Sequence, residues 1–432
     1  MNNFSKFKDL AFEPPGVIEE TQTKLIQKHL LYSLNNSPFY KKSLGNIIRD
    51  VSRISLSNFK DVPLTKKTSI EADNGGFCAV EAARIVDIVL SSGTTGQPIK
   101  IFYTEHDLKR LAYNEEKSFR GCGLTKNDVV LLTCTMDRCF IAGLAYFLGV
   151  RRLGASAIRN GHGSLDSHSE IIDMMKPTVI VGVPSFLKKL GTYMQTAKKN
   201  PSGSSVSKLI CIGEPLRNEK NMLLDIGIEL EATWNAKAYS TYASSETITT
   251  FCECLEQCGG HLHPDLAIVE VIDEEENVLG DRDIGQVVVT PLDIEGMPLI
   301  RYKTGDISFL MNEPCRCGRN SKRLGPILGR KKQMMKVKGT KLYPQAVYAA
   351  LDSLKAVQEY YIEVTSGTEL SDNLVVHVAV NDLSCDLELL QDRLQTHLRV
   401  KPNVILERED VIRKIVYTQE NRKPIRFFDR RK

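Results

Sequence analysis

The stretch TVIVGVP (178–184) is a short apolar run, rich in β-branched residues, that ends in glycine and proline. Similar runs occur at 84–90 (RIVDIVL), 128–136 (DVVLLTCTM) and 208–213 (KLICIG). Runs of this length and composition predict buried strands. Segments with helical spacing lie between them, at 106–120, 141–153, 168–176 and 185–199. Because strands and helices alternate, the sequence predicts an α/β fold with a parallel sheet covered on both faces.

The regions before and after this alternating segment have different sequence patterns. Leu25, Ile26, Leu30, Leu31 and Leu34 predict helix within residues 18–50, before the turn NNSPFY. After residue 260, two apolar runs flank EEENVLGDRD and predict a β-rich subdomain. Further helix and strand patterns from about 333 onward predict a small α+β domain. We therefore expect a large domain of mixed or parallel sheets at 1–330, with a possible metal-bearing β region at about 250–320, and a small domain at 331–432.

The composition narrows the classes of function. Of the 432 residues, 42% are hydrophobic and 25% are charged, and the formal charge is +4. A charge so small for this length argues against a general nucleic-acid or membrane-surface role. We find no apolar core of signal-peptide length and no run of roughly 18 apolar residues, and we expect a cytoplasmic protein. In that compartment the 11 cysteines favour thiols or metal ligands over disulfides.

The segment SSGTTGQP (91–98) lies between two apolar runs. Its glycines allow close backbone approach, and its hydroxyl groups and amides are suited to phosphate oxygens. It is not a Walker loop, because Gln97 stands where a lysine would be expected. A plain turn between two strands explains the segment equally well.

Two further segments end in a carboxylate. In YASSE (242–246), Glu246 is suited to Mg²⁺, although a helix cap is at least as common an explanation. In RYKTGD (301–306), Asp306 is placed to accept hydrogen bonds from ribose hydroxyls, or it is an ordinary turn residue. A late lysine, Lys423, either delivers a cation to a phosphate site or belongs to a solvated basic tail.

One group of residues has the composition of a metal site. CECLEQCGGHLH (252–263) and CRC (315–317) bracket the β region, and the set Cys254, His261, Cys315 and Cys317 would make a closed structural zinc site. Cys252, Cys258 and His263 are competing ligands, and free thiols remain an alternative.

The order of these segments resembles the adenylate-forming superfamily, and more closely its phenylacetate–CoA ligase family. The resemblance also rests on NSPFYKK (36–42), DVPLTKK (61–67), FIAGLAYFLGVRRLGASAI (140–158) and the pair ECLEQCGGHLHPD and PCRCGR. It implies an enzyme that activates a carboxylic acid with ATP and Mg²⁺, releases AMP, and passes the acyl group to coenzyme A. Four residues depart from the family pattern: Gln97, Ala243, Lys332 and Arg422.

The resemblance also implies a role for each predicted site residue. The phosphate loop is implied at Ser91, Ser92, Gly93, Thr94, Thr95 and Gly96, and the border of the adenosine site at Gly213, Glu214 and Pro215. The adenine contacts are implied at Ser240, Thr241 and Tyr242, and the ribose contacts at Asp306 and Arg330. Ser245 is implied at the α-phosphate, Glu246 at Mg²⁺, Lys423 as the catalytic lysine, and Lys332 as the hinge of a small mobile domain. The zinc ligands become Cys254, His261, Cys315 and Cys317.

The acyl pocket is the least specific part of the resemblance. It is implied at Phe140, Ala142, Gly143, Ile212 and Ala236, residues suited to an aryl or arylacetic acid but equally typical of a core. The thiol acceptor is coenzyme A or, alternatively, the phosphopantetheine arm of a carrier protein. A non-catalytic nucleotide-binding or zinc-stabilised module is a third hypothesis, and a homodimer is an open option for the assembly.

Overall fold

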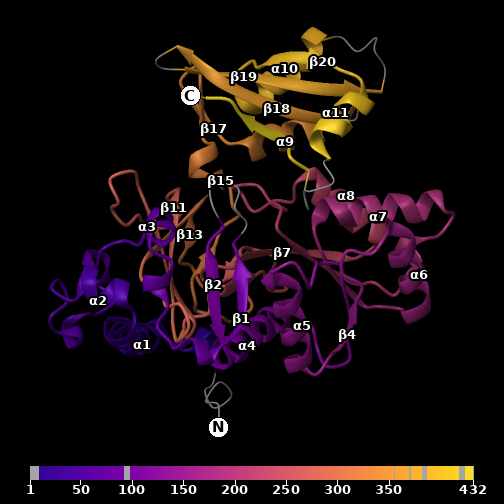
Figure 1. The fold of residues 1–432 in the computed structure, drawn as a ribbon. Coiled ribbons are helices and arrows are strands. Elements are labelled where there is room, and N and C mark those ends of the chain that lie inside the picture. Colours follow the sequence, from indigo (N-terminus) through magenta and orange to yellow (C-terminus); the bar gives the residue numbers. More distant parts are fainter. Residues whose placement is uncertain are drawn as a thin grey trace. The chain divides into compact units, whose positions relative to one another are not determined.

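The computed structural model describes residues 9–91, 98–354, 356–368, 371–381, 387–417 and 424–431. The chain divides into two units (Figure 1). The first comprises Met1–Thr304 and Ser308–Ile327, and the second comprises Gly305–Ile307 and Leu328–Lys432. The main division therefore falls between residues 327 and 328, whereas the sequence placed it between 330 and 331.

A six-stranded sheet forms the centre of the first unit, in the order β4-β3-β5-β6-β7-β8. Its strands are β3 (Val129–Leu132), β4 (Ser156–Arg159), β5 (Val179–Gly182), β6 (Lys208–Ile212), β7 (Lys237–Ser244) and β8 (Thr249–Cys252). The first five are parallel, and β8 pairs antiparallel with β7. The predicted parallel sheet is confirmed, with one antiparallel strand added at its edge.

Helices cover both faces of this sheet. They are α4 (Glu105–Gly121), α5 (Ile141–Leu153), α6 (Leu165–Met175), α7 (Pro184–Thr196) and α8 (Asp225–Trp234). Val130 and Leu132 pack with residues of α4 and α5, whereas Leu131 packs with residues of α6, α7 and α8, because side chains alternate along a strand. Figure 1 shows α7 and α8 on one side of β7 and α4 and α5 on the other.

The first apolar run of the alternating series does not join the large sheet. RIVDIVL becomes β1 (Ile85–Leu90), which pairs antiparallel with β2 (Lys100–Thr104) as a separate two-stranded hairpin. The expected strand formed, but it lies outside the alternating series, and it is not buried as predicted, since Val86, Ile88 and Leu90 are exposed. The two strands that flank SSGTTGQP therefore pair with each other, which a local sequence pattern does not reveal.

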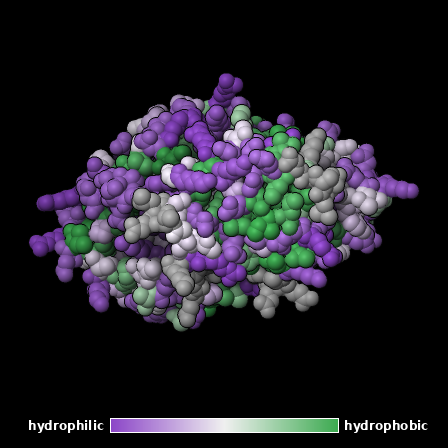
Figure 2. Space-filling view, turned by 90° about the horizontal axis from the view of Figure 1, so that it is seen from above, coloured by the Kyte–Doolittle hydropathy of each residue, from purple (hydrophilic) through white to green (hydrophobic). Residues whose placement is uncertain are grey.

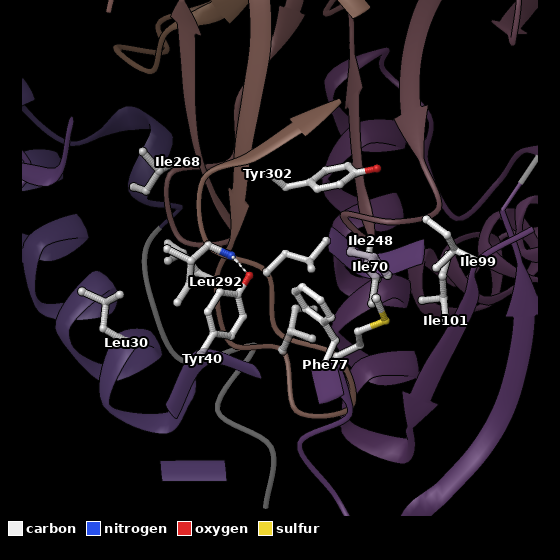
Figure 3. Packing of buried hydrophobic residues seen from close by; sticks show 14 of the residues in the cluster. Leu30, Tyr40, Ile70, Phe77, Ile99, Ile101, Ile248, Ile268, Leu292 and Tyr302 are labelled. Atoms are coloured by element: carbon white, nitrogen blue, oxygen red, sulfur yellow. Dashed lines mark hydrogen bonds between the residues drawn. The ribbon is translucent and has the colours of Figure 1, made fainter. Parts of the chain in front are cut away.

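The N-terminal helical region is shorter than predicted. Helix α1 (Pro15–Asn36) is followed by α2 (Pro38–Leu44), and residues 45–50 are not helical. Pro38 starts the second helix, since proline is suited to a first helical turn. A short helix α3 (Lys67–Ala72) follows. Leu30 of α1, Tyr40 of α2 and Ile70 of α3 enter one core cluster (Figure 3), in which the Ile300 amide donates to the Tyr40 hydroxyl at 2.9 Å.

The β-rich region after residue 260 forms two small sheets. Strands β10 (Ala267–Ile272), β11 (Gly285–Pro291) and β12 (Tyr302–Ser308) are successive neighbours in one sheet. The other has the order β13-β14-β9 and contains β9 (Gly260–His261), β13 (Leu310–Met311) and β14 (Arg323–Leu324). The predicted hairpin across EEENVLGDRD corresponds to β10 and β11, which pair antiparallel.

The second unit is a small α+β domain. Its main sheet has the order β20-β19-β18-β21 and contains β18 (Val357–Thr368), β19 (Ser371–Val380), β20 (Asn403–Leu406) and β21 (Phe427–Asp429). The helices are α9 (Pro344–Asp352), α10 (Leu387–Leu398) and α11 (Glu409–Val416), and a hairpin of β16 (Met335–Val337) and β17 (Thr340–Leu342) precedes them. Residues of α9 and α10 pack on one face of the sheet, and those of α11 pack on the other.

The surface carries both hydrophilic and hydrophobic residues. Figure 2 shows a face on which hydrophilic side chains are widespread and hydrophobic ones gather in one area. Among the described residues, no helix combines the length and apolar character needed to cross a membrane.

Candidate active site

A tight turn between β7 and β8 carries the predicted metal carboxylate. The turn spans residues 245–248, so Glu246 lies in a β-hairpin and not in the helix start that was one alternative. The Ser244 hydroxyl donates to the Glu246 carboxylate at 3.1 Å. Only 17% of the Glu246 side chain is exposed. The structure therefore holds this carboxylate close to the surface but largely screened from water.

Two residues to which the sequence gave no role contact this turn. The Lys67 ammonium, at the first residue of α3, lies 4.0 Å from the Glu246 carboxylate. The Tyr103 hydroxyl of β2 donates to the Ser245 carbonyl at 3.3 Å. DVPLTKK, which ends at Lys67, was a signal that the sequence analysis used for the family but not for the site.

Ser91 closes the base of the predicted phosphate loop. Its amide donates to the Ile99 carbonyl at 2.9 Å, and its hydroxyl accepts from the Ile99 amide at 3.1 Å. Ser92, Gly93, Thr94, Thr95 and Gly96 lie outside the described residues, as does Lys423. Tyr103 on the same hairpin reaches Ser245, so the strand that follows the loop also contacts the Glu246 turn.

The adenosine-border residues follow β6. Gly213 has φ of +73°, a left-handed conformation that favours glycine. The Glu214 carboxylate accepts from the Ser185 amide at 2.9 Å and from the Ser185 hydroxyl at 2.8 Å, at the start of α7. Because an anion is favourable at a helix N-terminus, the Glu214 carboxylate stabilises the start of α7 and connects it to the end of β6. The neighbouring Pro215 is half-buried.

The three predicted adenine contacts do not share one face of β7. The Thr241 hydroxyl donates to the Cys252 thiol at 3.0 Å, whereas the Tyr242 ring stacks on Phe251 with 6.3 Å between centroids. Ser240 is on the same side as Tyr242, because side chains alternate along a strand. The structure thus brings Ser240 and Tyr242 together and directs Thr241 to the opposite face.

The two predicted ribose contacts meet in the second unit. Asp306 and Arg330 are directly opposed in the antiparallel pair of β12 and β15 (Gly329–Arg330), and their charged groups are 3.3 Å apart. Asp306 is 14% exposed and Arg330 is 45% exposed. Lys332 lies just beyond them, exposed, in a short 3₁₀ helix (Lys331–Gln333).

The predicted acyl-pocket residues are only partly brought together. Ala142 and Ile212 belong to one cluster, between α5 and the sheet, and Phe140 caps the start of α5. Gly143 packs so tightly that an added Cβ would lie 2.2 Å from the Thr135 carbonyl oxygen. The prediction that Ala236 lines the acyl pocket is corrected. Ala236 precedes β7 and packs with the cluster on the other face of the sheet, so it does not line a pocket with Ala142 and Ile212.

The four predicted zinc ligands lie together in the first unit. The ligand atoms of Cys254, His261, Cys315 and Cys317 are all within 4.8 Å of one another. The Cys254 and Cys315 sulfurs are 3.7 Å apart, and the Cys317 sulfur is 3.4 Å from His261 Nε2. The Ser321 hydroxyl is 3.4 Å from the other ring nitrogen of His261. This set could hold one tetrahedral metal ion.

The competing ligands have other neighbours. The Cys252 sulfur is 3.1 Å from that of Cys122, and His263 Nε2 is 3.1 Å from the Ser118 hydroxyl. Cys258 is nearer, at 3.6 Å from the Cys315 sulfur, but the Arg323 guanidinium donates to its sulfur at 2.8 Å. The structure therefore brings together the four ligands that the resemblance implied, places Cys252 and His263 elsewhere, and leaves Cys258 beside the set with an arginine partner.

A buried carboxyl group on α4 was not anticipated. Glu115 is 1% exposed and accepts a short hydrogen bond from the Thr250 hydroxyl of β8. Its second oxygen has no hydrogen-bond partner among the described residues. Burial raises the pKa of this group from 4.5 to about 8, with the Thr250 hydrogen bond opposing the shift. Glu115 is therefore protonated in the folded chain at neutral pH.

We expect Glu115→Gln to remove a pH dependence of stability. Between pH 4.5 and about 8 the folded state holds a proton that the unfolded state has lost, so wild-type stability falls as the pH rises. The loss amounts to at most about 5 kcal/mol. Thermal midpoints at pH 5, 7 and 9 should decline less in Glu115→Gln than in the wild type. Parallel declines would contradict a protonated Glu115, and Glu116→Gln on the same helix is the control.

Comparison with known proteins gives a consistent result. Residues 41–291 match the family model described as AMP-binding enzyme. A phenylacetate–coenzyme A ligase of Thermus thermophilus is 29% identical over 380 residues, which cover 87% of this chain and 84% of that protein. The phenylacetate–coenzyme A ligase of Escherichia coli (strain K12) is 27% identical over 384 residues, 86% of this chain and 84% of that protein.

A solved structure is similar over nearly the whole chain. A crystal structure of 2-hydroxyisobutyryl-CoA ligase in its postadenylation state has a TM-score of 0.87, covering 99% of this chain and 96% of the other. At 22% identity this likeness shows the shared fold alone. The family model supplies the stronger statement, because it spans more than half of the 432 residues. The chain belongs to the family of AMP-binding enzymes, within which it groups with the phenylacetate–coenzyme A ligases.

Proposed function

We propose that this protein is an ATP-dependent, AMP-forming ligase that joins an aryl or arylacetic acid to coenzyme A. The observation that carries the proposal is the turn at 245–248, where Glu246 is held by Ser244 and Lys67 inside a chain that matches the AMP-binding family. The choice of an aryl or arylacetic acid is supported by the names of the relatives and by the apolar character of Ala142 and Ile212.

The first half-reaction brings two anions together. An oxygen of the substrate carboxylate bonds to the α-phosphorus of ATP, and the bond from that phosphorus to pyrophosphate breaks. Glu246 fits a Mg²⁺ ligand, and the bound ion would neutralise phosphate oxygens. Lys67, 4.0 Å from Glu246, would add a second positive charge near the bound phosphates.

The second half-reaction transfers the acyl group. The sulfur of the thiol bonds to the acyl carbon, the carbon–oxygen bond to AMP breaks, and the thiol proton is released. We assign the ribose contact to Asp306, whose carboxylate is positioned by Arg330 at 3.3 Å. We assign the catalytic cation of the first step to Lys423 and a hinge to Lys332. One lysine then serves adenylation and withdraws before the thiol enters.

We further propose that Cys254, His261, Cys315 and Cys317 hold a structural zinc ion. Two sulfurs each about 2.3 Å from a tetrahedral centre are about 3.8 Å apart. The observed separation of Cys254 and Cys315 is 3.7 Å, which fits. The Arg319 guanidinium donates to the Cys317 sulfur at 3.3 Å and would offset the charge of a three-thiolate site.

Pyrophosphate–ATP exchange tests the activity directly. We expect exchange that depends on an added acid, with phenylacetate and related aryl acids more active than short alkanoic acids. Adding coenzyme A should yield the acyl thioester and AMP, identified by mass spectrometry. Transfer to a holo carrier protein but not to coenzyme A would favour the carrier-protein alternative, and no exchange with any acid would refute the enzyme. Sedimentation of the same sample decides between monomer and homodimer.

A further inference from the structure

Arg110 is a fully buried cation on α4 that no part of the reaction described above uses. Its side chain is 0% exposed, and no salt bridge to it occurs among the described residues. Its guanidinium donates instead to three backbone carbonyls, at 2.6 Å to Leu292, at 2.6 Å to Ile248, and at short range to Leu266. These carbonyls come from three separate segments of the first unit, so one side chain connects all three.

The cation is kept charged in spite of its burial. Burial lowers the pKa of Arg110 to about 10, and the carboxylates of Asp293, Asp107 and Asp265 oppose that shift from a distance. The group is therefore protonated at neutral pH, and each of its three nitrogens donates to a carbonyl oxygen. Arginine is suited to this task because its planar group presents donors in a fixed geometry.

The Ile248 carbonyl belongs to the strained end of the Glu246 turn. Ile248 has φ of +51°, a left-handed conformation that β-branched residues rarely adopt. Its side chain is 1% exposed and packs in the large core cluster that Figure 3 shows. The turn can keep this conformation only where its surroundings hold it, and the Arg110 hydrogen bond is made to the strained residue itself.

We propose that Arg110 is a positioning residue for the Glu246 carboxylate, acting through the Ile248 carbonyl. The inference rests on the proposed role of Glu246 as the Mg²⁺ ligand. Ser245 is held at one end of the turn by Tyr103, and Ile248 is held at the other by Arg110, which leaves Glu246 between two fixed points. The contacts to Leu266 and Leu292 anchor the guanidinium to the start of β10 and the end of β11.

Arg110→Lys tests the proposal, because lysine keeps the charge but has one nitrogen in place of the three that each reach a different carbonyl. In acid-dependent pyrophosphate–ATP exchange by the full-length protein, we expect the Mg²⁺ concentration for half-maximal rate to rise about tenfold, and the Kd for ATP with Mg²⁺, measured by calorimetry without the acid, to rise as well. The KM for the acid should change less than twofold. If Arg110→Lys does not fold, Arg110→Gln, which keeps two N–H donors, provides the same comparison.

Asn114→Ala is the matched control. Asn114 is also buried on α4, one turn further along, and donates to the Thr250 carbonyl of β8 at 2.9 Å, but not to Ile248. We expect it to lower the thermal midpoint without changing the Mg²⁺ dependence. An unchanged Mg²⁺ dependence in Arg110→Lys, or an equal change in Asn114→Ala, would overturn the positioning role.

Glu246→Gln separates failure of this inference from failure of the proposed function. It should raise the Mg²⁺ requirement, and adding Arg110→Lys to it should raise the requirement no further, since both act on one ligand. If Glu246→Gln leaves the Mg²⁺ dependence unchanged, the assigned role of Glu246 is wrong. If Glu246→Gln changes it and Arg110→Lys does not, the proposal for Arg110 alone is wrong.

Discussion

Lys423→Ala is expected to lower the rate of acid-dependent pyrophosphate–ATP exchange by about 100- to 1000-fold. The reason is electrostatic: oxygens of the α-phosphate and the departing pyrophosphate gain charge in the transition state, and a positioned ammonium stabilises them. Transfer to coenzyme A from a chemically prepared acyl adenylate should change less than about threefold, because that step releases AMP and needs no such cation.

Lys414→Ala is the control for this prediction. Lys414 lies near the end of α11 in the same unit and is exposed to solvent. We expect its replacement to leave both half-reactions unchanged. Equal losses in both half-reactions for Lys423→Ala would indicate a folding defect. Exchange within a few fold of the wild-type rate would show that Lys67 or another cation serves adenylation instead.

Cys315→Ser is expected to abolish zinc binding and to destabilise the first unit. Native protein should contain about one zinc ion per chain. Loss of the ion would leave two thiols and an imidazole without their common partner, at the junction of β8, β9 and the loop at 315–317. A loss of about 3–4 kcal/mol corresponds to a fall of about 5 °C in the thermal midpoint of a unit of this size. Metal analysis and thermal unfolding measure the two effects together.

Cys258→Ser is the matched control, because Cys258 is 3.6 Å from the Cys315 sulfur but outside the set of four. It should retain the zinc ion. Loss of zinc in Cys258→Ser with retention in Cys315→Ser would assign the site to a different ligand set. Absence of zinc from protein purified without chelators would refute the site itself.

The sequence by itself determined the α/β class, the strands of the parallel sheet and the family. TVIVGVP and KLICIG became β5 and β6, because short apolar β-branched runs that alternate with helices are typical of the buried strands of a parallel sheet. The order of the motifs identified the family, because each motif is a local stretch of sequence and their order can be recognised without knowing how the chain folds. Asp306 and Arg330, both taken from this order, lie opposite each other in the structure.

Only the tertiary structure decided which distant residues meet. RIVDIVL has the composition of a buried sheet strand but pairs with β2 and leaves Val86, Ile88 and Leu90 exposed, because a local pattern fixes neither the partner strand nor what covers it. The same limit applies to Ala236, which lies on the wrong face, and to Lys67 and Arg110, whose roles come from neighbours far along the chain. The structure likewise gives Cys252 and His263 partners outside the zinc set, and it gives Cys258 a hydrogen bond from Arg323. Contacts of this kind depend on long-range packing, which no spacing within the sequence encodes.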